Sequence, residues 1–293
     1  MASQSQEQYR LVRLANGAYS VHSLAHAETF HPVIGPVQEG EILYVRQLHL
    51  PDRLRGTAGE FVVWDVGLGA AANALTVLRA MRPVAGRVRL ISFDHTTAPL
   101  EFARTHSLEL GYFDGYESPV EHLLKHGTAG FSNGMNAVQW QLILGDFPTW
   151  LERELRTRAT PTVPPPQAIL FDAFSPATNP AMWTLPLFRN LFRLLQPNVP
   201  CSLATYSRST LLRVSLLLGG FFVGSGHATG EKEETTIAAN TLALLETPLD
   251  RKWLMRARRS TSAEPLMEPV YRQARLTPET WDQLQAHPQF QSS

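Results

Sequence analysis

The run from Val62 to Leu75 limits the possible fold more than any other part of the chain. An apolar segment containing Asp65 is followed by Gly67 and Gly69, and then by an alanine-rich segment. Glycine permits a tight bend or a close approach of the backbone to a ligand. A helix that starts there directs its free N–H groups and its positive dipole end toward that point. The run therefore predicts a strand, a turn and a helix that hold a nucleotide or a nucleoside cofactor in an open α/β sheet.

This pattern alone leaves an alternative open. The dinucleotide fingerprint requires a third glycine where Ala72 stands. A tight strand-to-helix turn without a ligand is the other interpretation.

Apolar segments elsewhere alternate with amphipathic ones, which predicts an α/β fold with a Rossmann-like, doubly wound and mostly parallel sheet. Asn16-Gly17 lies between two β-prone segments and predicts a small N-terminal hairpin over residues 10–22, followed by an irregular stretch. The first expected strand of the sheet begins at Phe61, and further strands are expected at 88–94, 137–144, 168–172, 202–206 and within 235–245. Helices are expected at 73–81 and 210–218.

The bulk composition excludes several classes of protein. Twenty-six basic residues balance 26 acidic ones, so no overall positive field points to a nucleic-acid partner. One cysteine excludes an internal disulfide framework, and the histidines lack metal-ligand spacing. No apolar run has the length of a membrane span, so we expect a cytoplasmic protein without a membrane partner or a metal.

Acidic residues follow four of the expected strands. In a parallel sheet these strand ends lie along one edge, which is where ligands bind. A ring of carboxylates repels a pyrophosphate and attracts a sulfonium, which favours S-adenosyl-L-methionine as the cofactor. The four residues are Asp65, Asp94, Asp146 and Asp172.

Two motifs resemble those of the MnmC-type tRNA methyltransferases. One is the loop Asp65-x-Gly67-x-Gly69-x-Ala71-x-Asn73, where Ala71 replaces a third glycine and implies a slightly wider turn. The other, more specific motif covers Phe171–Trp183 and reads Phe-Asp-Ala-Phe-Ser-Pro-Ala-Thr-Asn-Pro-Ala-Met-Trp. The resemblance covers about residues 25–245 and implies the methyltransferase domain in stand-alone form, without the flavin oxidoreductase half of some members.

The resemblance implies methyl transfer from S-adenosyl-L-methionine to the amine of 5-aminomethyluridine at the tRNA wobble position. The loop residues Gly67, Gly69 and Asn73 would then hold the cofactor together with Asp65. Asp94 would accept hydrogen bonds from the ribose and Asp146 from the adenine amine. Asp172 would face the methyl group and the incoming amine as the catalytic residue.

Three further residues are implied at the RNA substrate. Phe174 and Trp183 would pack against the uracil, although Trp183 is equally well explained as a core residue. Lys232 is the basic residue left in Gly230–Glu234, where the family carries a basic run. The glutamates there either weaken phosphate binding or form a solvated charged turn.

The C-terminal part offers a replacement for that basic run. Arg251–Arg259 is rich in arginine and either contacts the anticodon region of tRNA or forms an amphipathic helix packed on the domain. We expect an N-terminal hairpin and cap over 1–55, a methyltransferase domain over 56–246 and an extension over 247–293. The sequence does not indicate the oligomeric state.

Two other functions remain open. One is the transfer of a methyl or aminopropyl group to a small polyamine-like acceptor, for which a ring of carboxylates is also suited. The other is a non-catalytic interaction protein that binds the cofactor or has lost it.

Overall fold

The computed structural model describes residues 8–157, 161–230 and 233–291, so the predicted substrate residue Lys232 lies outside the described residues. The chain divides into two compact units. The first comprises 1–146, 168–172 and 228–233, and the second comprises 147–167, 173–227 and 234–293. This division does not follow the expected boundaries at residues 55 and 246, which stay a prediction.

The expected N-terminal hairpin is present in the first unit. Strands β1 (Tyr9–Arg13) and β2 (Tyr19–Ser23) pair antiparallel with Arg13 opposite Tyr19, and β3 (Glu28–Thr29) adds a short third strand. Gly17 has a φ of 87°, and the Asn16 side chain accepts a hydrogen bond from the Ala18 N–H at 3.1 Å. Asn-Gly therefore forms this turn as the sequence predicts.

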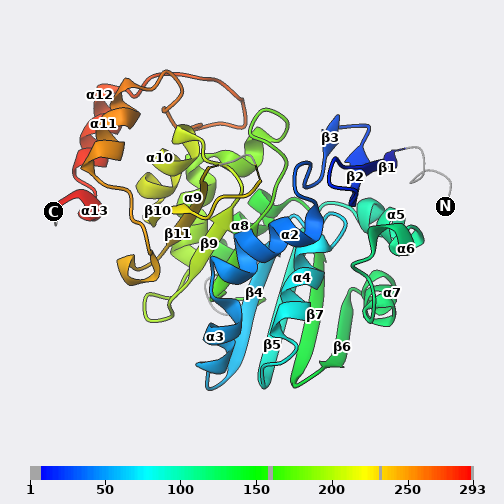
Figure 1. Ribbon diagram of the computed structural model, residues 1–293. Coiled ribbons are helices and arrows are strands. Elements are labelled where there is room, and N and C mark those ends of the chain that lie inside the picture. The colour runs from blue at the N-terminus through cyan, green and yellow to red at the C-terminus, as the bar shows by residue number, and fades with distance from the viewer. Residues whose placement is uncertain (1–7, 158–160, 231–232, 292–293) are drawn as a thin grey trace. The chain divides into compact units, whose positions relative to one another are not determined.

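The main sheet of the first unit has the strand order β8-β4-β5-β7-β6. Strands β4 (Glu60–Val66), β5 (Gly86–Asp94), β7 (Asn136–Leu144) and β8 (Ala168–Phe171) are parallel, as expected. At the edge, β6 (Thr128–Asn133) runs antiparallel to β7 and was not predicted. The carboxyl ends of the four parallel strands therefore meet at one edge (Figure 1). Asp65 and Asp94 lie at the ends of β4 and β5, and Asp146 and Asp172 follow β7 and β8.

Helices cover this sheet and replace the irregular cap that was expected before β4. Helix α4 (Ala72–Met81) follows β4, is almost fully buried and packs against α2 (Pro36–Gly40). A π-helical segment (Glu41–Arg46) and α3 (Leu50–Arg55) continue from α2, so the irregular cap is a wrong expectation. Pro36 and Pro51 lie within the first turns of α2 and α3, where the missing proline N–H costs nothing. Three more helices are α5 (Ala98–Thr105), α6 (Ser107–Leu110) and α7 (Glu117–His126).

The second unit contains an antiparallel sheet of order β10-β11-β9. Its strands are β9 (Ser202–Thr205), β10 (Phe222–Gly226) and β11 (Thr235–Ala239). The expected final strand ends at Ala239, because Leu242–Leu244 forms a 3₁₀ turn (η3). The strands in the two units together make a mixed α/β protein.

The helices of this unit bury apolar faces. They are α8 (Phe147–Arg156), the 3₁₀ helix η2 (Pro180–Trp183), α9 (Leu185–Leu194), α10 (Thr210–Gly219), α11 (Arg251–Arg259), α12 (Pro278–Gln285) and α13 (Pro288–Gln291). Within the described ranges of the chain, no helix combines the length and the apolar character that crossing a bilayer requires.

Candidate active site

The predicted loop after β4 is a left-handed turn that leads into α4. Gly67, Gly69 and Ala71 have φ values of 97°, 51° and 62°. Ala71 therefore adopts a conformation that favours glycine, and the expected widening of the turn stays a prediction. A Cβ added to Gly69 would lie 3.3 Å from the Phe30 ring, which packs over the loop. Both the backbone conformation and this close approach explain the glycine at position 69.

Asp94, at the end of β5, fixes this loop. Its Oδ2 accepts a hydrogen bond from the Gly69 N–H at 2.8 Å, and its Oδ1 accepts from the N–H groups of His95 and Thr96 at 2.7 and 3.2 Å. The side chain of Asp94 is 9% exposed. Among the described residues, only the Gly69 N–H donates to Oδ2, which so retains a lone pair for the ribose hydroxyls that the resemblance implies as its partners.

Asp65 is fully enclosed beneath the loop. Ser92 donates to its Oδ2 at 2.8 Å and receives a hydrogen bond from the Trp140 indole at 3.0 Å. The other oxygen, Oδ1, is buried and accepts no hydrogen bond from a described residue. The pKa of Asp65 is raised to about 7, chiefly by burial and also by the charges of Asp172 and Asp94, although the hydrogen bond from Ser92 lowers it.

Asp172 lies directly after β8, where its backbone N–H donates to the Val66 carbonyl at 2.9 Å. The Asn73 amide donates to Asp172 Oδ2 at 2.6 Å. Asn73 is thus a partner of the predicted catalytic carboxylate, and its own Oδ1 is buried without a partner among the described residues. The first helical turn of α4 therefore positions Asp172.

The predicted acids belong to one electrostatic group. Asp65 is within electrostatic reach of Asp94 and Asp172. The hydrogen bond that the His95 ring donates to Asp94 raises the pKa of His95 despite the opposing effect of burial, and the charges of Asp94 and Asp146 also raise it. Asp146 itself is exposed. The expected gathering of the four carboxylates at one sheet edge is confirmed.

Two histidines beside these acids were interpreted as ordinary residues. His95 Nδ1 lies 3.1 Å from Asp94 Oδ1, and His31 Nε2 lies 3.7 Å from Asp172 Oδ2. His95 was detectable from its position directly after a strand-end acid. His31 had no comparable signal, because the fold alone brings it to a residue 141 positions later.

The second unit contains the residues predicted to contact uracil. Trp183 is 0% exposed, and its indole N–H donates to the Phe174 carbonyl at 2.7 Å. This corrects the assignment of Trp183 as a substrate contact, because the buried ring serves as a core residue. Phe174 is partly exposed, and its substrate role stays a prediction.

The acidic turn and the basic run also have structural explanations. Glu234 pairs with the 2%-exposed guanidinium of Arg213 at 3.0 Å and accepts from the Ser225 hydroxyl at 2.7 Å. Burial of Glu234 raises its pKa, but Ser225 and Arg213 outweigh this effect and lower it. Glu234 therefore neutralises a buried cation, whereas Glu231 and Lys232 lie outside the described residues.

The basic run forms the amphipathic helix α11, which was one of its two interpretations. Trp253, Leu254 and Ala257 are buried, whereas its lysine and four arginines are exposed. Arg258 stacks over the Trp281 ring at 4.8 Å, and Arg251 donates to the Phe290 carbonyl. Among the described residues, no carboxylate forms a salt bridge with α11.

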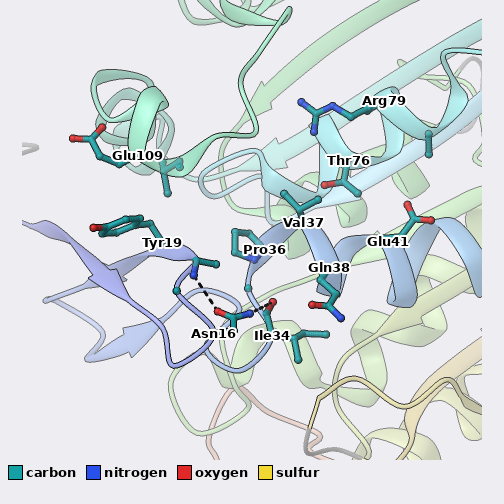
Figure 2. A pocket seen from close by; sticks show the side chains of 15 residues that line it. Asn16, Tyr19, Ile34, Pro36, Val37, Gln38, Glu41, Thr76, Arg79 and Glu109 are labelled. Carbon is teal, nitrogen blue, oxygen red and sulfur yellow. Dashed lines mark hydrogen bonds between the residues drawn. The ribbon is translucent and has the colours of Figure 1, made fainter.

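A separate cavity of about 670 Å³ lies in the first unit (Figure 2). Its walls are the hairpin turn at Asn16, the start of α2, the outer side of α4 at Arg79, and Glu109 of α6. None of the predicted site residues lines it. The cavity is thus not the site at the strand ends.

The strand-end site fits an adenosyl sulfonium cofactor. Gly67 and Gly69 have no side chains that would block a ligand at the loop. Asp65 Oδ1 and Asn73 Oδ1 are buried and accept no hydrogen bond from the described residues. The surrounding charges are carboxylates, which suit a cationic ligand and oppose a phosphate. The assignment of Asp65, Gly67, Gly69, Asn73, Asp94 and Asp146 to the cofactor stays a prediction.

Comparison with known proteins identifies the class. Residues 125–241, less than half of the chain, match the family described as S-adenosyl-L-methionine-dependent methyltransferase. The fold, the strand-end site and this match together indicate methyl transfer that depends on S-adenosyl-L-methionine.

Within this class the similarity is to MnmC. The chain is 28% identical over 234 residues to the tRNA 5-methylaminomethyl-2-thiouridine biosynthesis bifunctional protein MnmC of Methylibium petroleiphilum, which covers 77% of this chain and 34% of that protein. The MnmC of Aeromonas hydrophila is 28% identical over 215 residues, which cover 68% and 30% of the two chains. The chain thus spans about a third of the length of these relatives.

A solved structure has the same fold. The crystal structure of MNMC2 from Aquifex aeolicus superposes with a TM-score of 0.68 at 21% identity, covering 94% of this chain and 82% of that one. The predicted resemblance to the methyltransferase part of MnmC is therefore confirmed.

Proposed function

We propose that this protein methylates the amine of 5-aminomethyluridine at the wobble position of tRNA. The observation that carries the proposal is the carboxylate of Asp172, which Asn73 holds beside the glycine loop. The MnmC relatives, named for tRNA 5-methylaminomethyl-2-thiouridine biosynthesis, support this choice of substrate. Such a substrate would place the protein in the cytoplasm, with the anticodon region of tRNA as its partner.

The chain supplies binding and orientation at this site. Gly67 and Gly69 admit the methionine part of S-adenosyl-L-methionine, Asp94 accepts from the ribose, and Asp146 accepts from the adenine amine. When bound, the cofactor supplies an electrophilic methyl group. Asn73 and the buried Asp65 support the loop and the carboxylates from behind.

Asp172 has to present a neutral amine. An alkylammonium is not a nucleophile, so it must lose a proton before it reacts. A carboxylate that accepts hydrogen bonds from the amine orients it and takes up the proton as charge develops. The hydrogen bond from Asn73 holds one oxygen of Asp172 and so helps to orient this carboxylate.

The exposed face of α11 is the proposed contact for the tRNA backbone. Lys252, Arg256 and Arg259 lie on this face and are exposed. Phosphates attract such clusters in a salt-dependent manner. Glu234 is paired with Arg213 and does not offer a positive charge to RNA. The basic face of α11 would therefore take the place of the basic run that the family carries near residue 232.

The test uses the purified chain, S-adenosyl-L-methionine and tRNA from cells that lack this methylation. Nucleoside mass spectrometry is expected to show conversion of 5-aminomethyluridine to its N-methyl form. Asp172→Asn should lose at least about a hundredfold in rate while retaining cofactor affinity. The matched control Asp114→Asn, at an exposed site, should retain both. Unchanged tRNA with the wild-type chain would refute the proposal.

A polyamine-like acceptor is a second candidate, because the gathered carboxylates of the site also suit a small polycation. The same assay with spermidine in place of tRNA separates the two. Methylation or aminopropylation of spermidine without modification of tRNA would favour this candidate.

A further inference from the structure

His31 lies between two carboxylates of the first unit. Its Nε2 is 3.7 Å from Asp172 Oδ2, and its Nδ1 is 3.9 Å from Glu39 Oε2. The side chains of His31, Asp172 and Glu39 are 9, 16 and 8% exposed. The imidazole thus connects the predicted catalytic carboxylate to a second, more deeply buried acid.

The backbone at His31 is in an uncommon conformation. Its φ is 49°, in the left-handed region that a residue with a Cβ rarely adopts. The preceding residue is fixed, because the Phe30 N–H donates to the Val21 carbonyl at 2.8 Å and Ser20 donates to the Phe30 carbonyl. The Phe30 ring also packs against Gly69. Such strain persists where surrounding contacts hold it and is common at functional sites.

We propose that His31 is a positioning residue that receives the proton from Asp172 and keeps this carboxylate ionised for the next amine. The proposal rests on the methyltransferase function given above. Imidazole changes its charge near neutral pH, whereas a carboxylate alone holds a proton poorly there. Glu39 stabilises the imidazolium from the opposite side.

The proton balance of the step is as follows. The substrate ammonium gives one proton to Asp172, and Asp172 passes it to His31, which becomes an imidazolium. The free amine lone pair forms the N–CH3 bond while the S–CH3 bond breaks and its electron pair stays on sulfur. The methylated product leaves as an ammonium, and His31 releases the first proton to water.

Two acids lie within 4 Å of the His31 ring. Glu39 comes from α2, and Asp172 follows β8. Behind Asp172, the carboxylate of Asp65 at the end of β4 is within electrostatic reach of Asp172 and Asp94. These negative charges favour the imidazolium over the neutral ring.

The first test measures this coupling without any turnover. The His31 ring is titrated by NMR in the wild-type chain, in Asp172→Asn and in Glu39→Gln. Removing either carboxylate is expected to lower the His31 midpoint by about one pH unit. The exposed His122 serves as an internal control and should not move. A His31 midpoint that stays constant in Asp172→Asn would overturn the proposal.

The second test compares pH–rate profiles. His31→Asn is the chosen variant, because asparagine tolerates the left-handed backbone at this position. Its affinity for S-adenosyl-L-methionine, measured by calorimetry, is expected within twofold of wild type. Its kcat/KM should fall about tenfold or more, with a changed dependence on pH. A profile parallel to that of wild type would reject the proton role.

The two proposals fail in different ways. If tRNA is not a substrate, the methylation assay fails while the NMR coupling of His31 to Asp172 is still observed. If His31 has only a structural role, tRNA is methylated and the titration shows no coupling. His31→Gln, which retains a polar side chain, provides a second variant if His31→Asn does not fold.

Discussion

The backbone N–H of Gly69 donates to the side chain of Asp94 at 2.8 Å and so ties the loop after β4 to the end of β5. The second oxygen of the same carboxylate accepts two further backbone N–H groups. One acid therefore organises the turn that we propose to hold the cofactor. This explains why the acid is placed at the strand end.

Replacing Asp94 with alanine should leave three N–H groups without their acceptor. Because buried unpaired donors are costly, we expect a loss of about 2 kcal/mol in unfolding free energy and at least tenfold weaker binding of S-adenosyl-L-methionine. Urea denaturation and calorimetry measure the two effects. Asp114→Ala, at an exposed acid, is the control. Unchanged cofactor affinity in Asp94→Ala would show that the loop does not depend on this acid.

Substitutions at two positions of the loop after β4 should change the free energy of unfolding in opposite directions. Ala71→Gly relieves a φ of 62° and should stabilise the fold by about 0.5–1 kcal/mol. Gly69→Ala imposes a side chain at a φ of 51° and against Phe30, so it should destabilise the fold by about 1 kcal/mol or more. Denaturant titrations of both variants test this pair. If both variants were stabilised or both destabilised, the described geometry of the loop would be contradicted.

The raised pKa of Asp65 predicts that the free energy of unfolding falls as the pH rises. Its pKa of about 7 in the folded protein lies above its ordinary value of 3.8, so the folded state binds this proton more tightly than the unfolded state. The stabilisation is complete below about pH 4 and is lost as the pH rises to about 7. Asp65→Asn mimics the protonated form and should reduce the loss of unfolding free energy between pH 5 and pH 8. A variant with the full wild-type loss would exclude Asp65 as its source.

The parallel strands and α4 were predictable because their apolar segments and glycine turns are local signals. Strand β6 was missed, since Thr128–Asn133 is poor in β-branched and aromatic residues. Its pairing, Asn133 opposite Asn136, encloses a turn at Gly134 with a φ of 63°. Asn133-Gly134 is a hairpin signal of the same kind as Asn16-Gly17 and was available in the sequence.

The candidate site, like the fold, was only partly predictable from the sequence. The acids were predictable because each follows a strand, and parallel strands bring their ends together. The contacts of Asn73 and His31 with Asp172 were not, because they join positions far apart in the chain. Trp183 was misassigned in part because aromatic residues serve equally in cores and at base-stacking sites. Burial decides between the two, and the sequence does not contain it.

The basic face of α11 predicts a salt-dependent contact with tRNA. Lys252→Glu combined with Arg259→Glu should weaken tRNA binding at least tenfold and reduce the slope of log affinity against log salt by about 1.5. Filter binding at several salt concentrations measures both quantities. The control combines Arg87→Glu with Lys125→Glu, which changes the charge equally at exposed positions of the first unit. Equal losses in the two double variants would indicate only a net-charge effect.

The central claim is that carboxylates at the strand ends select an adenosyl sulfonium over a phosphate-bearing nucleotide. Calorimetry of the purified chain with S-adenosyl-L-methionine and, separately, with NAD⁺ tests it most directly. We predict one bound S-adenosyl-L-methionine with a dissociation constant in the micromolar range, on the order of −8 kcal/mol, and no measurable binding of NAD⁺. Binding of NAD⁺ in preference to S-adenosyl-L-methionine would contradict the account.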